Sequence, residues 1–283
     1  MEGLQKFHLS PDFRASNGTM QSSFAHAVNF SFCIAEEERL FTILCEGAVL
    51  LPDSVILSKS LFEEIKKFEE TQIFLKNTSF SIGQTFVTMA SEYAVDLFLP
   101  HFMIGRKDAL IPERFSFIEK LITQQKKKSA LHQMPKRYTD MLRDFVICLF
   151  KGEKQNTKAI YTMLAGAGKG LTPACDDAIT GILAFVSAYM PSYQEYAELV
   201  YPILNDLQTV HRTTKVSEKY IKCACRGMFS LPLLYLLSWI AGCYDSFPMK
   251  EFQEMVEIGH TSGMDTLFGI QIAFAAFMSM YQH

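Results

Sequence analysis

The chain has 283 residues, of which 49% are hydrophobic and 20% charged, and its formal net charge at pH 7 is −3. This length and composition predict a globular protein of one large or two medium domains with a substantial core. Because no basic run is longer than Lys126-Lys127-Lys128, the broad positive surface of a nucleic-acid-binding protein is not expected.

The first 21 residues carry charges at Glu2, Lys6 and Arg14 and contain no apolar block. We therefore expect no secretory signal and a cytoplasmic protein. The seven cysteines are odd in number and lie among apolar residues, which is typical of reduced core thiols rather than of a disulfide framework. Only Cys223 and Cys225 are closely paired, and one such pair does not complete a zinc ligand set.

From about residue 22 to residue 100 the sequence consists of short β-rich runs separated by breakers, a pattern typical of an all-β barrel or sandwich. Between these runs, Leu61, Phe62, Ile65 and Phe68 have helical spacing and predict a helix over residues 61–70. The predicted strands are residues 27–33, 40–45, 54–57, 72–75, 79–82, 85–89 and 96–99.

After Pro112 the hydrophobic period becomes that of helices, first over residues 115–127 and then over residues 137–150, and the pattern stays helical to the end of the chain. We therefore predict an α+β protein, with a β-rich domain over residues 1–110 and an α-helical domain over residues 111–283. The composition changes around residues 105–112.

Two apolar stretches, residues 228–244 and 267–281, are shorter than the roughly 20 residues that span a bilayer. We expect both to be buried helices of a large helical core, and no membrane partner.

The central motif begins with glycines at alternate positions, Gly166, Gly168 and Gly170, with Lys169 among them. Such a loop can turn tightly and present its backbone N–H groups to an anion. Its spacing fits neither a Walker A loop nor a dinucleotide-binding loop.

A helix is expected directly after this loop, with Thr172 as its N-cap, and its positive N-terminus would add a second anion-attracting element. Asp176 and Asp177 fall in its first turn, where carboxylates are favoured even as simple capping residues. Two carboxylates beside an anion loop could also bind a cation such as Mg²⁺ or a substrate N–H group. Gly181, on the same face, would leave room for a substrate or for another helix.

Part of this pattern recurs near the C-terminus. Asp265 and Gly269 have the same spacing as Asp177 and Gly181. The loop before Asp265 offers Ser262 and Gly263, and two converging helix N-termini could bind both ends of a small anion. His260 could act there as a general acid or base, or be purely structural.

A third group of hydrogen-bond donors is Arg212, Thr213 and Thr214, ahead of a helix predicted over residues 218–229. Arg212 suits a bidentate grip on a carboxylate or phosphate, and the hydroxyls could donate to the same oxygens. The alternative is a solvated loop with Ser217 as N-cap.

Together these residues resemble the AllH family, which is associated with the oxamate carbamoyltransferase of anaerobic allantoin and purine breakdown. The family pattern G-x-G-x-G-L-T-P-S-G-D-D-x-x-x-G is met by residues 166–181, except that Ala174-Cys175 replaces Ser-Gly. Further matches lie at residues 23–29, 51–54, 212–217 and 259–265. The departure bears on substrate specificity, and Cys175 could be a reactive thiol at a helix start or a packed one.

The resemblance implies a transferase subunit, within an assembly of several different subunits, that moves a carbamoyl group between carbamoyl phosphate and oxamate and, in catabolism, runs toward carbamoyl phosphate from oxalurate. Under this hypothesis Asp176, Asp177 and His260 are catalytic. The substrate-binding residues would be Gly166, Gly168, Lys169, Gly170, Thr172, Arg212, Thr213, Thr214, Ser262, Gly263 and Asp265.

Two other functions are compatible with these residues. The chain could be a non-catalytic scaffold subunit whose glycine loop binds a metabolite while partner subunits perform the chemistry. A metal-dependent amidohydrolase using Asp176, Asp177 and His260 is disfavoured because no compact ligand set such as H-x-H is present. No resident cofactor is predicted, and Mg²⁺ is the cation that the acid pair could bind.

Overall fold

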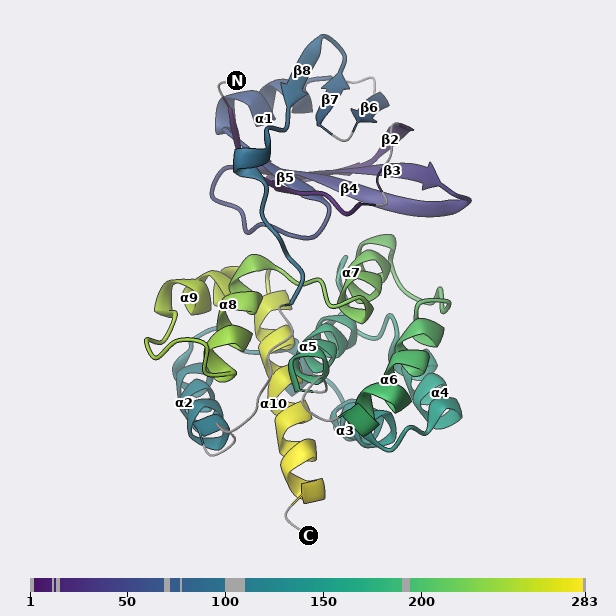
Figure 1. Cartoon of the computed structure of the whole chain (residues 1–283), viewed down its shortest axis with the longest axis vertical. Helices are drawn as coiled ribbons and strands as arrows, with labels where there is room; N and C mark the ends of the chain where they lie inside the picture. The colour runs from purple at the N-terminus through teal and green to yellow at the C-terminus, as the bar shows by residue number, and fades with distance from the viewer. Residues whose placement is uncertain are drawn as a thin grey trace. The chain divides into compact units, whose positions relative to one another are not determined.

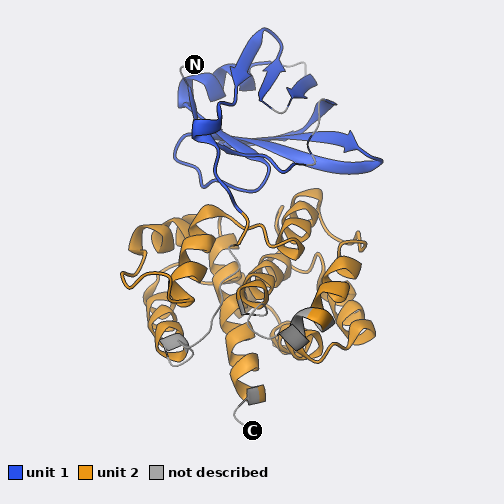
Figure 2. Ribbon diagram, viewed as in Figure 1, with its two compact units in different colours: residues 1–97 blue, residues 98–283 orange. Residues whose placement is uncertain are grey.

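The computed structural model describes residues 3–11, 13, 16–68, 72–76, 78–99, 110–189 and 194–281. Two compact units, residues 1–97 and residues 98–283, make up the chain (Figure 2). The first contains the strands and the second contains the long helices, which confirms the α+β prediction (Figure 1). The domain change predicted at residues 105–112 falls mostly outside the described residues, so the boundary between 110 and 111 stays a prediction.

Eight strands in the first unit form one nearly closed, barrel-like sheet in the order β1-β5-β4-β3-β2-β6-β7-β8. Neighbouring strands are antiparallel except β4 and β5, which are parallel. The elements are β1 (Leu4–His8), β2 (Ser16–Ser23), β3 (Ala27–Ile34), β4 (Glu37–Cys45), β5 (Ser54–Leu57), α1 (Lys59–Lys66), β6 (Gln72–Lys76), β7 (Ser79–Ile82), β8 (Thr85–Thr88) and the 3₁₀ helix η1 (Ser91–Tyr93).

The predicted runs from residue 27 to residue 89 correspond to β3 through β8, but the strand predicted over residues 96–99 is wrong. Phe98 forms only an isolated bridge with Met228 there. The predicted helix over 61–70 is α1, which begins two residues earlier because Ser58 caps it by accepting from the Leu61 N–H. Residues 69 and 70 lie outside the described residues.

The sequence pattern does not predict strands β1 and β2. Most residues of β2 are polar, and the strand exists because it pairs with β3 on one side and β6 on the other. Gly18 in β2 is required by packing: a Cβ there would lie 2.6 Å from the ring of Phe32. Tertiary pairing, rather than an alternating apolar pattern, therefore makes this strand.

Aromatic side chains fill the core of the first unit. Phe41 packs edge-to-face against Phe13, Phe32 and Phe80, with ring centroids 6.0 to 6.5 Å apart. All four rings are almost fully buried. Offset and edge-to-face rings of this kind add to the stabilisation from buried apolar area.

The two segments of the first unit that resemble the family, residues 23–29 and 51–54, form hydrogen bonds within that unit. Asn29 donates to Ser22 Oγ at 3.0 Å and accepts from the Thr42 hydroxyl at 2.9 Å. Asp53 has a φ of +49°, donates its N–H to His8 Nδ1 at 3.1 Å and accepts from the Ser10 N–H at 2.7 Å. These two motifs therefore hold neighbouring strands of the sheet together.

The second unit is built from helices. They are α2 (Leu110–Gln124), η2 (Ala130–Gln133), α3 (Arg137–Phe150), α4 (Lys154–Leu164), α5 (Ala174–Tyr189), α6 (Gln194–Leu207), α7 (Lys215–Cys225), α8 (Leu231–Ile240), α9 (Met249–Glu257) and α10 (Ser262–Tyr281). The predicted bounds of α3 are confirmed. The helix expected over 218–229 begins three residues earlier, because Thr214 and not Ser217 is its N-cap.

Helices α5 and α10 are the most extensively packed pair of elements, and they cross in the middle of the second unit (Figure 1). A Cβ on Gly181 would lie 2.0 Å from the Thr266 carbonyl oxygen, and a Cβ on Gly269 would lie 2.0 Å from that of Ala178. Each glycine thus presses on the backbone of the other helix. Gly181 makes room for a helix, which decides between the two alternatives left open by the sequence.

Helix α10 is long and apolar enough, over Ser262–Met280, to cross a membrane by length and composition. Of that stretch, 61% is buried inside the structure, against α2, α3, α5 and α9. This burial fits the core helix that the sequence predicts.

The first testable prediction concerns this crossing. Alanine normally favours a helix over glycine by about 1 kcal/mol. We expect Gly269→Ala instead to lower the free energy of unfolding by about 3 kcal/mol, since its methyl group meets a backbone carbonyl that cannot move alone. Denaturant unfolding followed by circular dichroism measures this change.

The control is Gly47→Ala, at a surface glycine with a φ of +84° and nothing within 4 Å of the added Cβ. We expect a cost of only about 1 kcal/mol there, from backbone conformation alone. An equal effect of the two substitutions would contradict the close contact.

Candidate functional site

The glycine loop has the backbone that the sequence predicts, with φ angles of +79° at Gly166, +130° at Gly168 and +95° at Gly170. Two of these glycines are required by close approach. A Cβ would lie 2.8 Å from the Arg212 carbonyl oxygen at Gly166 and 2.4 Å from the Ala174 nitrogen at Gly168. The tip at Gly170 is exposed, with nothing within 4 Å of such an atom.

Asp176, on α5, connects this helix to the glycine loop and to the 212–214 segment. Its Oδ1 accepts from the Gly166 N–H at 2.9 Å, and its Oδ2 accepts from the Thr213 hydroxyl. Burial raises the pKa of Asp176, while the hydroxyls of Thr213 and Ser217 and the Gly166 N–H oppose that rise. Both carboxyl oxygens of Asp176 are therefore occupied by protein donors, and the Gly166 N–H is not available to an anion.

Residues 212–214 pack along the same loop. The Thr214 side chain caps α7 by accepting from the Ser217 N–H at 3.1 Å, and its hydroxyl donates to the Leu171 carbonyl. Together with the bond from Thr213 to Asp176, this holds residues 213 and 214 against α5 and the end of the glycine loop. Arg212 itself is exposed.

Asp265 occupies the first turn of α10 and is bound by the segment that leads into η2. Its Oδ1 accepts from the Ser129 hydroxyl at 2.5 Å and from the Ala130 N–H at 2.8 Å. Its Oδ2 is buried and has no hydrogen-bond partner among the described residues. Burial raises the pKa of Asp265, while the hydroxyls of Ser129 and Thr261 and the N–H groups of Ala130 and Leu131 oppose the rise. No sequence pattern indicates a role for Ser129, because it lies far from every motif.

Asp177 lies where the two helix starts meet. Thr172, ahead of α5, and Ser262, at the start of α10, share a hydrogen bond of 2.7 Å. Burial raises the pKa of Asp177 well above its usual range, the hydroxyls of Ser262 and Thr172 oppose the shift, and the charges of Asp265 and Asp176 add to it. Its Oδ2 has no hydrogen-bond partner in the described part of the chain.

Three predicted site residues, Lys169, Arg212 and His260, are exposed side chains on these loops. No ion pair or hydrogen bond of their side chains occurs within the described ranges. Gly263 differs, because a Cβ there would lie 1.7 Å from the Met255 carbonyl oxygen of α9. Its lack of a side chain is explained by helix packing, and its contact with a substrate remains a prediction.

The departure from the family pattern, Ala174-Cys175, faces inward. Both residues are buried, and burial raises the pKa of the Cys175 thiol to about 12. A thiol with such a pKa stays protonated at neutral pH and is a poor nucleophile. Cys175 therefore acts as a packed core thiol.

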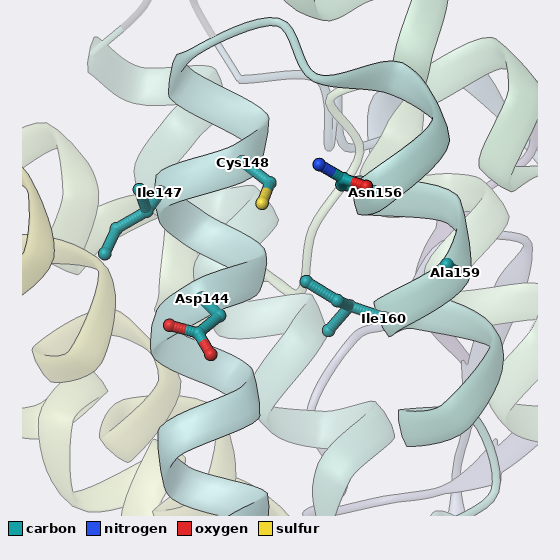
Figure 3. A pocket seen from close by; sticks show the side chains of 6 residues that line it. All are labelled: Asp144, Ile147, Cys148, Asn156, Ala159 and Ile160. Carbon is teal, nitrogen blue, oxygen red and sulfur yellow. The ribbon is translucent and has the colours of Figure 1, made fainter.

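Among the described residues, no group of three or more His, Cys, Asp or Glu side chains could hold a metal ion. An open pocket of about 270 Å³ lies between α3 and α4 and shares no residue with the loops above (Figure 3). It is lined by Asp144, Ile147, Cys148, Asn156, Ala159 and Ile160.

Two family models match the chain. The model described as oxamate carbamoyltransferase subunit AllH matches residues 164–274, and the AllH family N-terminal domain matches residues 4–96. The first range contains the glycine loop, the 212–214 segment and both aspartate-bearing helix starts, and the second contains the whole sheet. No solved structure matches the chain.

The geometry of Asp176 yields the second prediction. Asp176→Ala should lower the free energy of unfolding by about 2 to 4 kcal/mol, because it leaves the Gly166 N–H and the Thr213 hydroxyl without their acceptor. Lys169→Ala, on the same loop but exposed, should change it by less than about 0.5 kcal/mol. Urea unfolding of both variants measures the difference, and equal stabilities would refute the structural role of Asp176.

Proposed function

The chain belongs to the AllH family, and from this premise we propose that it binds the substrates of an oxamate carbamoyltransferase at the junction of its two helix starts. The family is that of a subunit of this enzyme. The observation that carries the proposal is the hydrogen bond between Thr172 and Ser262, which joins the starts of α5 and α10. Two helix N-termini at one place favour the binding of small anions.

We assign the phosphate group to the glycine loop. The tip around Gly170 is exposed, and no hydrogen-bond partner of the N–H groups of Gly168, Lys169 and Gly170 is found among the described residues. Together with the Lys169 ammonium group and the start of α5, these donors suit the phosphate of carbamoyl phosphate.

The carboxylate of oxamate or oxalurate goes to Arg212 in this proposal. Its carbonyl oxygen contacts Gly166, so its side chain starts beside the glycine loop. Because the hydroxyls of Thr213 and Thr214 already donate to Asp176 and Leu171, we propose that they hold Arg212 in place. A guanidinium group on a fixed backbone can grip a carboxylate with two parallel hydrogen bonds.

The reaction then needs positioning, oxyanion stabilisation and one proton transfer. In the direction of phosphorolysis, a phosphate oxygen attacks the carbamoyl carbon of oxalurate, and the bond from that carbon to the oxamate nitrogen breaks. The electron pair of this bond stays on nitrogen, which takes up a proton, while hydrogen phosphate loses one. Asp177, its neighbour Asp176 in the first turn of α5, and His260 are the groups that we propose for this proton transfer.

Pathway, location and metal requirement are parts of the same proposal. We propose that the enzyme acts in the cytoplasm, in the anaerobic breakdown of allantoin and purines, together with other subunits. Because each oxygen of Asp176 already accepts a hydrogen bond from the protein, we propose that a Mg²⁺ ion in this site arrives with the phosphate rather than resides on the acid pair.

One observation favours a second function, that of a non-catalytic metabolite-binding scaffold subunit. Asp176, Asp177 and Asp265 are all at least nine-tenths buried, and two of them are bound to donors of the protein itself. In that case a partner subunit would supply the groups that react.

The third prediction separates the two functions. The purified chain, alone and with its partner subunits, would be assayed for carbamoyl phosphate formed from oxalurate and phosphate. We expect Arg212→Ala to raise the KM for oxalurate, and Lys169→Ala the KM for phosphate, each by about 10- to 100-fold through the loss of a charge-assisted hydrogen bond.

The matched control is Lys120→Ala, an exposed lysine on α2, which should leave both KM values unchanged. Activity that survives the double change Asp176→Ala and Asp177→Ala in a folded protein would reject the catalytic site. Substrate binding without any turnover by the chain alone, with turnover restored by partners that carry the reacting groups, would favour the scaffold.

A further inference from the structure

The longest basic run of the chain, residues 126–128, lies in the link between α2 and η2, and its three lysines differ in their contacts. Lys126 is exposed. Lys128 is also exposed, and its ammonium group donates to the nearby Thr123 carbonyl at 2.7 Å, which caps the C-terminus of α2. Lys127 is half-buried and binds residues that are more than a hundred positions away. The proposed function does not use this lysine.

Lys127 binds the segment between α9 and α10. Its ammonium group donates to the Val256 carbonyl at 2.6 Å and to the Gly259 carbonyl at 2.9 Å. The Val256 carbonyl belongs to the last turn of α9, where carbonyl groups have no partner within the helix. The Gly259 carbonyl lies beyond the helix, in a turn where Gly259 has a φ of +56°. The first bond is a helix cap, and the second fixes the loop that follows the helix.

The same link between α2 and η2 also binds the start of α10. The Ser129 hydroxyl and the Ala130 N–H donate to Oδ1 of Asp265, at 2.5 Å and 2.8 Å. Lys127 therefore attaches the link to the loop on one side of residues 260–262, and these two donors attach it on the other side. The three residues between the two attachments include two that the proposed function places in the site.

The bond from Lys127 to Gly259 acts on both of these site residues. The Gly259 carbonyl shares a planar peptide bond with the N–H of His260, so its position sets that of the His260 backbone. In addition, a Cβ on Gly259 would lie only 3.0 Å from Ser262 Oγ, so the backbone at residue 259 packs directly against that hydroxyl. The Ser262 hydroxyl in turn shares the 2.7 Å hydrogen bond with Thr172 that joins the starts of α5 and α10. Consecutive printed contacts thus lead from the Lys127 ammonium group to the junction of the two helix starts.

We propose that Lys127 is a positioning residue of the candidate site, which fixes the loop of residues 258–262 for proton transfer. The catalytic part of this inference rests on the proposed function. Lys127 itself touches no substrate, since the phosphate and the carboxylate are assigned to Lys169 and Arg212 on other loops. An ammonium group has three donors and can bind two carbonyl oxygens at once. Because a displacement of about 1 Å can slow a reaction by about 10²-fold, a bond that fixes this loop matters for turnover.

The fourth prediction tests the hold of Lys127 on the loop without any assay of activity. Lys127→Met keeps the length of the side chain and removes the ammonium group. Two amides report on the loop, because the Ile258 N–H donates to the Met255 carbonyl and the Gly263 N–H donates to the Ile258 carbonyl, each at 3.2 Å. We expect both to exchange hydrogen faster by about 10-fold or more, as for the loss of a charge-assisted hydrogen bond. Mass spectrometry of peptides that cover residues 256–265 measures this exchange in the whole protein.

Two variants serve as controls for the exchange. Lys126→Met removes the charge of an exposed lysine next to Lys127 and should leave the exchange of these amides unchanged. Lys127→Arg, whose guanidinium group can also donate to two carbonyl oxygens, should keep most of the protection. Unchanged exchange in Lys127→Met would refute the hold of Lys127 on the loop.

The positioning role has its own readout in the enzyme assembled with its partner subunits, a split between kcat and KM for oxalurate phosphorolysis. Lys127→Met should lower kcat per folded enzyme by about 10- to 100-fold, because the groups that transfer the proton are displaced. The KM values for phosphate and oxalurate should change by less than about threefold, since Lys169 and Arg212 lie on other loops. Lys127→Arg should restore most of the kcat.

Lys128→Met is the matched control for a purely structural role, because it also removes a lysine that caps a helix. It should leave kcat per folded enzyme unchanged. An equal loss of kcat in Lys127→Met and Lys128→Met, or no loss in either, would overturn the positioning role. If the wild-type protein with its partners does not turn over oxalurate, the proposed function and the catalytic part of this inference fail, while the hydrogen exchange still decides whether Lys127 holds the loop.

Discussion

The contact on which the second unit depends is the backbone crossing of α5 and α10. Gly181 lies on the Thr266 carbonyl and Gly269 on the Ala178 carbonyl, and at neither position is there room for a Cβ. This close approach brings the helix starts to the Thr172–Ser262 hydrogen bond one to two turns away. A larger residue at either glycine would separate the helices and, with them, the loops that precede them.

Buried carboxyl groups on the two helices bind the loops by hydrogen bonds. Asp176 binds the glycine loop through Gly166 and the 212–214 segment through Thr213, while Asp265 binds the start of η2. Each carboxyl group costs free energy to bury, and each regains it only when its donors are in place. The loops are therefore fixed by a few strong polar contacts around an apolar helix pair, and removal of any one acceptor leaves buried donors unpaired.

Patterns that depend on neighbouring residues could be predicted from the sequence, and patterns that depend on distant ones could not. The apolar stripe from Met141 to Leu149 gave the bounds of α3, and the alternate glycines gave the left-handed backbone of the loop. By contrast, β2 exists through its pairing with β3 and β6, and Ser129 reaches Asp265 from 136 positions away. The shared spacing of Asp177-Gly181 and Asp265-Gly269 was visible as a pattern, but only the crossing shows that each glycine serves the other helix.

The polar residues of the loops fall into two groups, those that hydrogen-bond within the protein and those whose side chains are exposed. The hydroxyls of Thr213 and Thr214, the Gly166 N–H and the carboxyl groups of Asp176 and Asp265 are engaged within the protein. The cationic side chains on the same loops, Lys169 and Arg212, are exposed instead. Since the backbone beneath them is fixed, little entropy would be lost in ordering these loops around a ligand, and preorganised donors of positive sign bind anions with the least reorganisation. The structure thus separates residues that hold the loops from exposed cationic residues, and these carry the charge that the proposed phosphate and carboxylate ligands require.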